Sequence, residues 1–144
     1  MKTLGASNRT GYRVIYGDTD KMGVAYYANY LRWFELGRSE LLRQVGHPYR
    51  MIEERGTYFP VVEVSCRYFK SAHYDDLIVI QTALTMIARA SLGFAYRIHL
   101  AGDDSLIASG STKHACVDKD GRVRRIEREL IESLRAEIAF DLDK

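Results

Sequence analysis

The chain has 144 residues, of which 47% are hydrophobic and 28% charged, and only two are prolines. This length and composition indicate one folded domain over residues 1–144 and exclude a disordered or collagen-like chain. A formal net charge of +2 argues against a surface that binds nucleic acid broadly, so any anionic ligand must be met by a local patch.

Export and disulfide signals are both missing from the sequence. No apolar run approaches the ~20 residues of a membrane span, and residues 1–10 lack the apolar core of a signal peptide. We therefore expect a cytoplasmic protein with no membrane span. Cys66 and Cys116 are too few for a disulfide framework or a zinc site, so we expect two reduced core cysteines and no metal.

The first predicted elements are a β-strand at residues 12–16 and a long amphipathic helix at residues 26–45. On the helix, residues that suit a buried face recur at steps of three or four: Tyr30, Phe34, Gly37, Leu41 and Val45. Gly46 and Pro48 end the helix. Within it, Gly37 costs roughly 1 kcal/mol relative to alanine. We expect another backbone to approach Gly37 closely, as in a sheet wrapped around the helix.

A short helix is predicted at residues 49–55, and a final helix at residues 127–138. Between them, four long strands are expected at residues 58–70, 77–87, 92–100 and 106–117. The short links that separate these strands favour an antiparallel meander. A strand, a helix and four successive strands together predict an α+β fold.

Two aspartates, Asp18 and Asp20, stand directly before the long helix. A helix N-terminus presents unpaired N–H groups, which favour an anion or a developing oxyanion. A carboxylate beside them can act as nucleophile or general base. Alternatively, both aspartates are turn and capping residues. A calcium loop is excluded, because Met22 and Asn29 stand at two of its ligand positions.

A longer motif contains these aspartates. The string DTDxxGVxYxxxY at residues 18–30, with Phe-Glu at residues 34–35 and Arg38, resembles the signature of the 4-hydroxybenzoyl-CoA thioesterase family. That family belongs to the hot-dog superfamily and includes the acyl-CoA thioesterases of the Tol-Pal cluster. The resemblance extends from residue 12 to about residue 118 and includes Pro60 and the Arg-x-Ser step at residues 89–91.

The resemblance implies a hot-dog fold, in which a curved antiparallel five-stranded sheet wraps around one long central helix. It also implies homodimers with a joined sheet, often paired into a dimer of dimers, with active sites at the subunit interface. The implied reaction is hydrolysis of an acyl-CoA, short-chain aliphatic or aryl, to the free acid and CoA. It implies no cofactor, and an acyl carrier protein is a further candidate partner.

The resemblance also assigns catalytic residues. The family's catalytic carboxylate falls on Asp20, as nucleophile or general base, and the oxyanion-binding backbone N–H falls on Tyr27. Gly23 completes the predicted catalytic set. At the position of Tyr27 the Tol-Pal branch has histidine, and the tyrosine found here matches the aryl-CoA branch instead. Since a thiol with a pKa of roughly 8.5 leaves readily as thiolate, no strong general acid is required.

Predicted substrate contacts are Arg89, Ser91 and Tyr30. Arg89 matches a phosphate-contacting position of the family, although Ala88 and Ala90 are not basic as they are in the aryl-CoA enzyme. A second basic group is either another phosphate site or a solvated face. It consists of Lys119, Arg122, Arg124, Arg125 and Arg128.

Two other functions stay open at this point. A hot-dog hydratase or dehydratase acting on acyl thioesters would use a histidine paired with a carboxylate, and no histidine lies near Asp20 in the sequence. A non-catalytic module would bind acyl-CoA or an acyl carrier protein and use the acidic loop only as structure. The acyl group itself, whether aromatic, short or long, is not fixed by the sequence.

Overall fold

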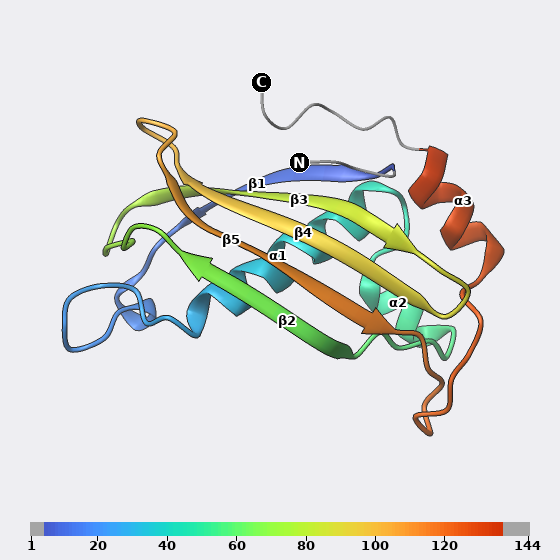
Figure 1. Ribbon diagram of the computed structural model, residues 1–144. Helices are drawn as coiled ribbons and strands as arrows, with labels where there is room; N and C mark the ends of the chain where they lie inside the picture. Colours follow the sequence, from blue (N-terminus) through green and yellow to red (C-terminus); the bar gives the residue numbers. More distant parts are fainter. Residues whose placement is uncertain (1–4, 137–144) are drawn as a thin grey trace.

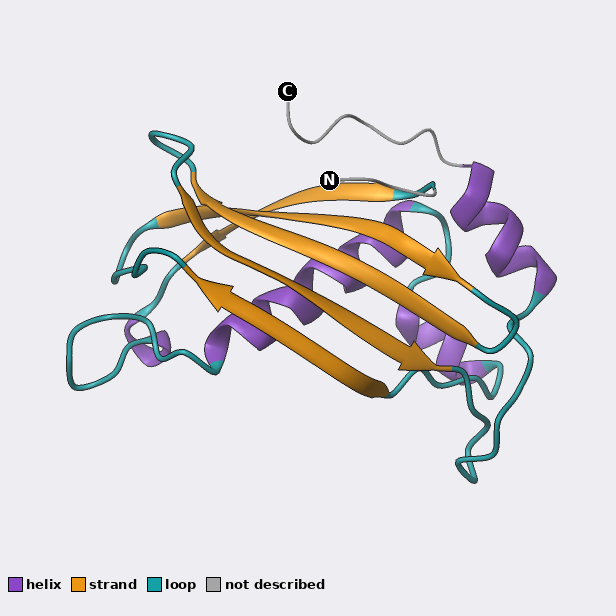
Figure 2. Cartoon of the chain, in the orientation of Figure 1, coloured by secondary structure: helices purple, strands orange, loops and turns teal. Residues whose placement is uncertain are grey.

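One antiparallel sheet with a long helix against one of its faces forms the protein (Figures 1 and 2). This computed structural model describes residues 5–136. The strands are β1 (Ser7–Arg13), β2 (Val61–Tyr68), β3 (Leu77–Ile87), β4 (Ser91–Leu100) and β5 (Leu106–Ala115). The helices are α1 (Asn29–Gln44), α2 (Tyr49–Glu54) and α3 (Arg128–Ala136), and a 3-10 turn, η1 (Tyr16–Asp18), precedes α1. The predicted α+β class and the five-stranded sheet around a central helix are confirmed.

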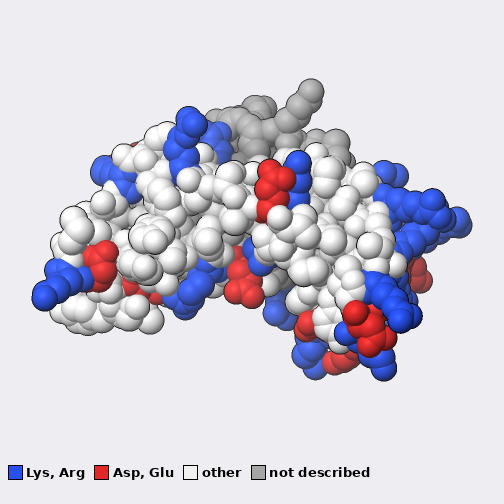
Figure 3. All heavy atoms as spheres, turned by 60° about the horizontal axis from the view of Figure 1, so that its bottom comes forward, with Lys and Arg blue, Asp and Glu red and all other residues white. Residues whose placement is uncertain are grey.

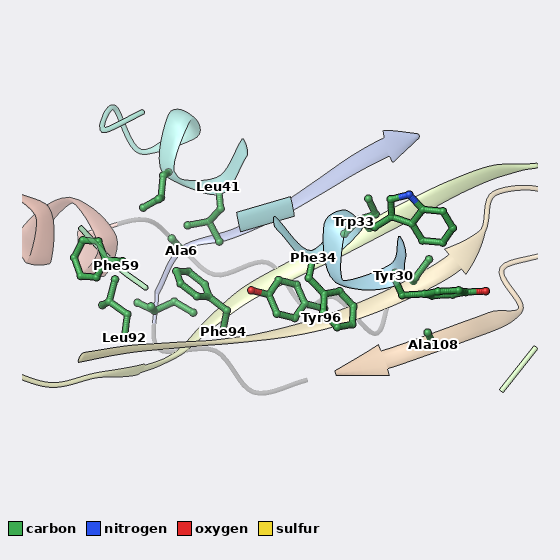
Figure 4. Close-up of a cluster of buried hydrophobic side chains, with 14 of the residues drawn as sticks. Ala6, Tyr30, Trp33, Phe34, Leu41, Phe59, Leu92, Phe94, Tyr96 and Ala108 are labelled. Atoms are coloured by element: carbon green, nitrogen blue, oxygen red, sulfur yellow. The ribbon is translucent and has the colours of Figure 1, made fainter. Parts of the chain in front are cut away.

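The core lies between α1 and the sheet. The buried face of α1 carries the residues of the predicted stripe except Val45, which is half-buried, and adds Trp33 and Leu42. Phe34 stacks on Tyr96 of β4 with ring centroids 4.3 Å apart (Figure 4). Because both rings are buried, this contact fixes the helix over the sheet.

Gly37 is the point of closest approach between α1 and β3. A Cβ atom there would lie 2.8 Å from Cγ2 of Ile80 and would overlap Oγ1 of Thr82. The predicted close approach is therefore real, but the neighbours are side chains of β3 and not a second backbone.

The predicted meander is wrong for β2. The sheet order is β1-β3-β4-β5-β2, so only β3, β4 and β5 form a meander, and β2 pairs with β5. β1 takes the edge of β3 that β2 was expected to occupy. The link at residues 69–76 can cross three strand spacings of about 4.8 Å, because an extended chain of that length spans about 25 Å.

Some predicted boundaries are also wrong. The first strand is Ser7–Arg13 and not residues 12–16, because residues 16–18 turn into η1. α1 begins at Asn29, three residues later than predicted, since the preceding residues form a small hairpin. β3 matches its prediction at both ends. The final helix begins at Arg128, and the predicted end at residue 138 lies outside the described residues.

β2 is an edge strand, and most of it is exposed on both faces. Its helix side is apolar, yet α1 packs mainly against β1, β3 and β4. Val62 is 63% exposed, and Val64 and Tyr68 are 44% and 43% exposed. Within residues 5–136, no helix is long and apolar enough to cross a membrane.

Candidate active site

Asp20 lies in a small hairpin between η1 and α1. The N–H of Asp20 donates to the carbonyl of Val24 at 2.9 Å, and Thr19 pairs with Ala25 across the hairpin. The N–H of Gly23 donates to the carbonyl of Asp20 at 3.0 Å and closes the turn. Gly23 has φ of +82°, a left-handed conformation that favours glycine. The geometry thus gives Gly23 a role in the turn, with its N–H already occupied.

The Asp20 carboxylate is only partly satisfied. Its Oδ1 accepts the N–H of Met22 at 2.9 Å, while Oδ2 has no hydrogen-bond donor among residues 5–136. Nor does any lysine or arginine of the described chain form an ion pair with it. The carboxylate lines a hollow of about 330 Å³. A carboxylate without a counter-ion, at the edge of a hollow, is suited to act on a ligand.

Backbone donors lie at the start of α1, where Tyr27 lines the same hollow. The N–H of Tyr26 donates to the carbonyl of Asp18 at 2.8 Å, and the N–H of Asn29 donates to the carbonyl of Tyr26 at 2.9 Å. Between them, the N–H groups of Tyr27 and Ala28 have no acceptor within residues 5–136. Two free N–H groups ahead of a helix form a site for a carbonyl oxygen that gains negative charge.

The end of β2 completes the wall of this hollow. Tyr68, Phe69 and Lys70 line it opposite the helix start. The hydroxyl of Tyr68 donates to the carbonyl of Tyr27 at 2.8 Å. Burial raises the pKa of Tyr68, so the hydroxyl keeps its proton and remains a donor. The hydrogen bond ties the helix start to β2 and leaves the Tyr27 N–H free.

Tyr30, predicted to contact substrate, lies at the floor of the hollow. Its ring is 2% exposed and packs edge-on against Tyr68, with centroids 4.9 Å apart. Its hydroxyl accepts the N–H of Ala72 at 3.2 Å, and burial raises its pKa. Figure 4 shows its ring beside Trp33 in the core. Tyr30 can therefore offer the edge of a ring to a ligand, while its hydroxyl is already bonded.

Asp18 is unlike Asp20, because it is fully buried and fully bonded. Its Oδ2 accepts the hydroxyl of Tyr12 at 2.7 Å and the N–H of Ile15 at 2.9 Å. Its Oδ1 accepts Nη1 of Arg32 at 3.1 Å. Of the two interpretations left open for this pair, the structural one fits Asp18, and the half-buried carboxylate of Asp20 is the one free for chemistry.

Arg89 and Ser91 lie far from Asp20 within one chain. Arg89 lies in the turn between β3 and β4, and Ser91 is the first residue of β4. This turn is at the opposite end of the sheet from the hairpin that precedes α1 (Figure 1). The basic group at residues 119–128 follows β5, and the N–H of Ile126 donates to the carbonyl of Arg89 at 2.9 Å. On the face that Figure 3 shows, positive and negative side chains are interspersed.

None of the four histidines, all within the described chain, lines the hollow at Asp20. His114 is buried, with Nδ1 2.9 Å from the carbonyl of Phe59 and Nε2 2.8 Å from Oγ1 of Thr112. Burial lowers its pKa, and the neighbouring Arg38 adds to the effect. His114 borders a separate cavity of about 210 Å³ between α1 and the sheet. Among residues 5–136, no cluster of three potential metal ligands occurs.

Sequence reasoning missed Tyr68, Tyr12 and Arg32 at this site. Tyr68 reaches Tyr27 only because β2 lies at the sheet edge beside the helix start, and nothing local in the sequence indicates that placement. Arg32 is fourteen residues after Asp18 in the sequence. It lies in the first turn of α1, and its side chain reaches the buried carboxylate from there.

Comparison with known proteins decides the family. A model described as the thioesterase-like superfamily matches residues 14–138. The chain belongs to this superfamily. It is 35% identical over 107 residues to the acyl-CoA thioesterase YbgC of Haemophilus influenzae, covering 74% of this chain and 77% of that protein.

Other thioesterases show the same relationship. The chain is 27% identical over 122 residues to 4-hydroxybenzoyl-CoA thioesterase of a Pseudomonas species, covering 80% of this chain and 86% of that protein. The crystal structure of DHNA-CoA thioesterase from Staphylococcus aureus superposes with a TM-score of 0.84 at 28% identity. That match covers 90% of this chain and 91% of the other. The predicted relationship to 4-hydroxybenzoyl-CoA thioesterases is confirmed.

Proposed function

We propose that this thioesterase-like chain hydrolyses acyl-CoA thioesters to the free acid and CoA. One observation carries the proposal: the unpaired carboxylate of Asp20 shares a hollow with the free N–H of Tyr27. Membership of the superfamily and the named acyl-CoA and aryl-CoA thioesterases among the relatives support it.

The reaction begins with the thioester carbonyl against the helix start. Its oxygen accepts the N–H of Tyr27, with the N–H of Ala28 as a second donor, and these donors stabilise the charge that develops there. One such donor contributes about 2.7 to 4 kcal/mol to barrier lowering in comparable sites. The carboxylate of Asp20 then stands beside the carbonyl carbon.

Asp20 acts on the carbonyl in one of two ways. As a nucleophile, its oxygen bonds to the carbonyl carbon, the C–S bond breaks, and CoA leaves as thiolate; water then cleaves the mixed anhydride. As a general base, Asp20 takes a proton from water while the water oxygen bonds to the carbonyl carbon; the C–S bond then breaks and CoA leaves as thiolate. Both routes use the same groups and need no cofactor, so we propose that none is bound.

We also propose a homodimer through the β2 edges. The exposed apolar helix side of β2 supports it, since a second copy in an antiparallel pair would cover Val62 and Val64 and continue the sheet. Such a pair sets the Val61 end of one β2 beside the Tyr68 end of the other. It thereby moves the β3–β4 turn of the second copy, with its Arg89, toward this chain's Asp20. A dimer of dimers is the further assembly we propose.

Light scattering after size exclusion tests the dimer. We expect Val62→Asp to give monomers with little hydrolytic activity, because the charge would be buried at the joined edge. Val123→Asp is the matched control, since Val123 is 76% exposed and lies outside β2. A dimeric Val62→Asp variant would contradict the proposed interface.

A substrate panel tests the reaction and ranks the acyl groups. CoA release is followed for aromatic, short-chain and long-chain acyl-CoAs, and for the same acyl groups on an acyl carrier protein. We expect thioester cleavage and no hydration of enoyl-CoA, since no histidine lines the hollow. A chain that binds these thioesters without cleaving any would instead be a binding module.

A further inference from the structure

Asp18 is the only acidic side chain that is buried within residues 5–136, and it holds three segments together. Its carboxylate receives one donor from β1, one from the loop before η1 and one from α1: Tyr12, Ile15 and Arg32. A buried carboxylate needs this number of donors, because desolvation is offset only by hydrogen bonds and an opposite charge.

The backbone carbonyl of Asp18 holds the start of α1 as well. It accepts the N–H of Tyr26 at 2.8 Å and Nδ2 of Asn29 at 2.7 Å. Asp18 therefore accepts five hydrogen bonds, three through its carboxylate and two through its carbonyl, and its N–H donates a sixth to the carbonyl of Ile15 at 3.0 Å.

These bonds connect Asp18 to both halves of the candidate site. Asp20 follows it by two residues, on the strand of the hairpin that Asp18 begins. Tyr26, bonded to the Asp18 carbonyl, immediately precedes Tyr27, whose N–H is free. The half-exposed hairpin at residues 19–25 also has hydrogen bonds between its own two strands. Those bonds do not fix the hairpin relative to the start of α1, whereas the bonds of Asp18 do.

We infer that Asp18 is the positioning residue of the thioesterase site, which sets the Asp20 carboxylate against the Tyr27 N–H. The inference rests on the proposed function. Asp18 has no free oxygen for substrate, so it acts through Asp20 and the helix start. A misplacement of about 1 Å in such a site reduces turnover about 100-fold.

A double-mutant cycle with Asp18→Asn and Asp20→Asn tests this role on the full chain with its best acyl-CoA substrate. Asparagine keeps the size of Asp18 but turns an amide NH₂ toward donors. We expect kcat to fall about 10- to 100-fold, with KM within about threefold. In the Asp20→Asn background, Asp18→Asn should cause a clearly smaller loss than in wild type, because the part of its effect that passes through Asp20 is already removed. Loss that multiplies in the double variant overturns the inference, as does an unchanged kcat.

Hydrogen exchange separates positioning from general destabilisation. In Asp18→Asn, we expect faster amide exchange confined to residues 19–28, with β3 to β5 unchanged. Faster exchange over the whole sheet would show a merely structural role and overturn the inference. Asp103→Asn is the matched control, since Asp103 also accepts two hydrogen bonds within a turn, from Ser105, but lies outside the site.

Two further arms keep the test decisive. If Asp18→Asn does not fold, Tyr12→Phe removes one donor and keeps the charge, and a smaller loss of kcat with the same non-additivity is expected. If wild type cleaves no acyl-CoA, the proposed function is contradicted. The exchange pattern then still decides whether Asp18 holds residues 19–28.

Discussion

Replacing Gly37 with alanine tests how tightly the central helix packs on the sheet. The new Cβ would overlap Oγ1 of Thr82 and lie 2.8 Å from Cγ2 of Ile80. Both neighbours belong to β3, which is hydrogen-bonded on both sides, so neither can move far. The helix must therefore shift away from the sheet and loosen the stack of Phe34 on Tyr96.

Two opposite effects set the magnitude. Alanine gains about 1 kcal/mol over glycine in a helix, whereas overpacking of a dense core costs about 1 to 3 kcal/mol. Because the Cβ would overlap a buried oxygen that cannot move far, we place the overpacking cost of Gly37→Ala in the upper part of this range. After the gain in helix propensity is subtracted, we expect a net destabilisation of about 1 to 2 kcal/mol.

Urea unfolding followed by circular dichroism measures this difference. Thr82→Ala removes the overlapping atom, which is buried and has no hydrogen-bond partner within residues 5–136, and should relieve much of the loss in the double variant. Gly102→Ala is the control, because no atom of the described residues outside its immediate neighbours lies within 4 Å of a Cβ there. If Gly37→Ala were as stable as wild type, or equally destabilising in the Thr82→Ala background, the packing argument would be refuted.

Three further predictions concern single side chains. Tyr68→Phe removes the donor to the Tyr27 carbonyl and should lower stability by about 1 kcal/mol and kcat about fivefold, measured by urea unfolding and steady-state kinetics. Burial lowers the pKa of His114 below its ordinary 6.5, so below pH 6.5 the unfolded chain binds a proton that the folded chain does not. Stability should therefore fall as pH drops from 6.5, by up to about 1.4 kcal/mol per pH unit, and the slope should flatten in His114→Gln. Burial raises the pKa of both cysteine thiols, so the disulfide reagent DTNB should react with Cys116 only after unfolding and with Cys66 slowly. A pH-independent stability, or a fast reaction of Cys116 in the folded chain, would contradict the assigned burial.

Local patterns predicted the parts of the fold that depend on local sequence. The 3.6-residue period located the buried face of α1, and the apolar run of β3 gave both of its ends. β1 was misplaced because its sequence, SNRTGYR, belongs to a sheet edge and carries little apolar signal. The position of β2 beside β5 depends on contacts distant in sequence, which short links do not reveal.

The candidate site divides in the same way. The aspartate pair and the helix start are neighbours in sequence, so Asp20 and Tyr27 could be named from the motif. Tyr68 reaches the site because β2 lies at the edge of the sheet, and Arg32 reaches it from the first turn of α1. The spacing of residues in the sequence indicates neither contact. Arg89 was grouped with Asp20 through family resemblance, yet Arg89 lies between β3 and β4 and Asp20 lies between η1 and α1. Within one subunit, these two loops are at opposite ends of the sheet (Figure 1). Their association rests on the proposed dimer.

The central claim is that Asp20 performs the chemistry while other groups hold the substrate. Its most direct test is the turnover of Asp20→Asn at saturating acyl-CoA, beside the affinity of wild type and variant for a non-cleavable thioether analogue. The variant keeps the size of the side chain and removes its charge. We predict that kcat falls at least about 100-fold while the affinity for the analogue stays within about threefold. Turnover at the wild-type rate would contradict the assignment.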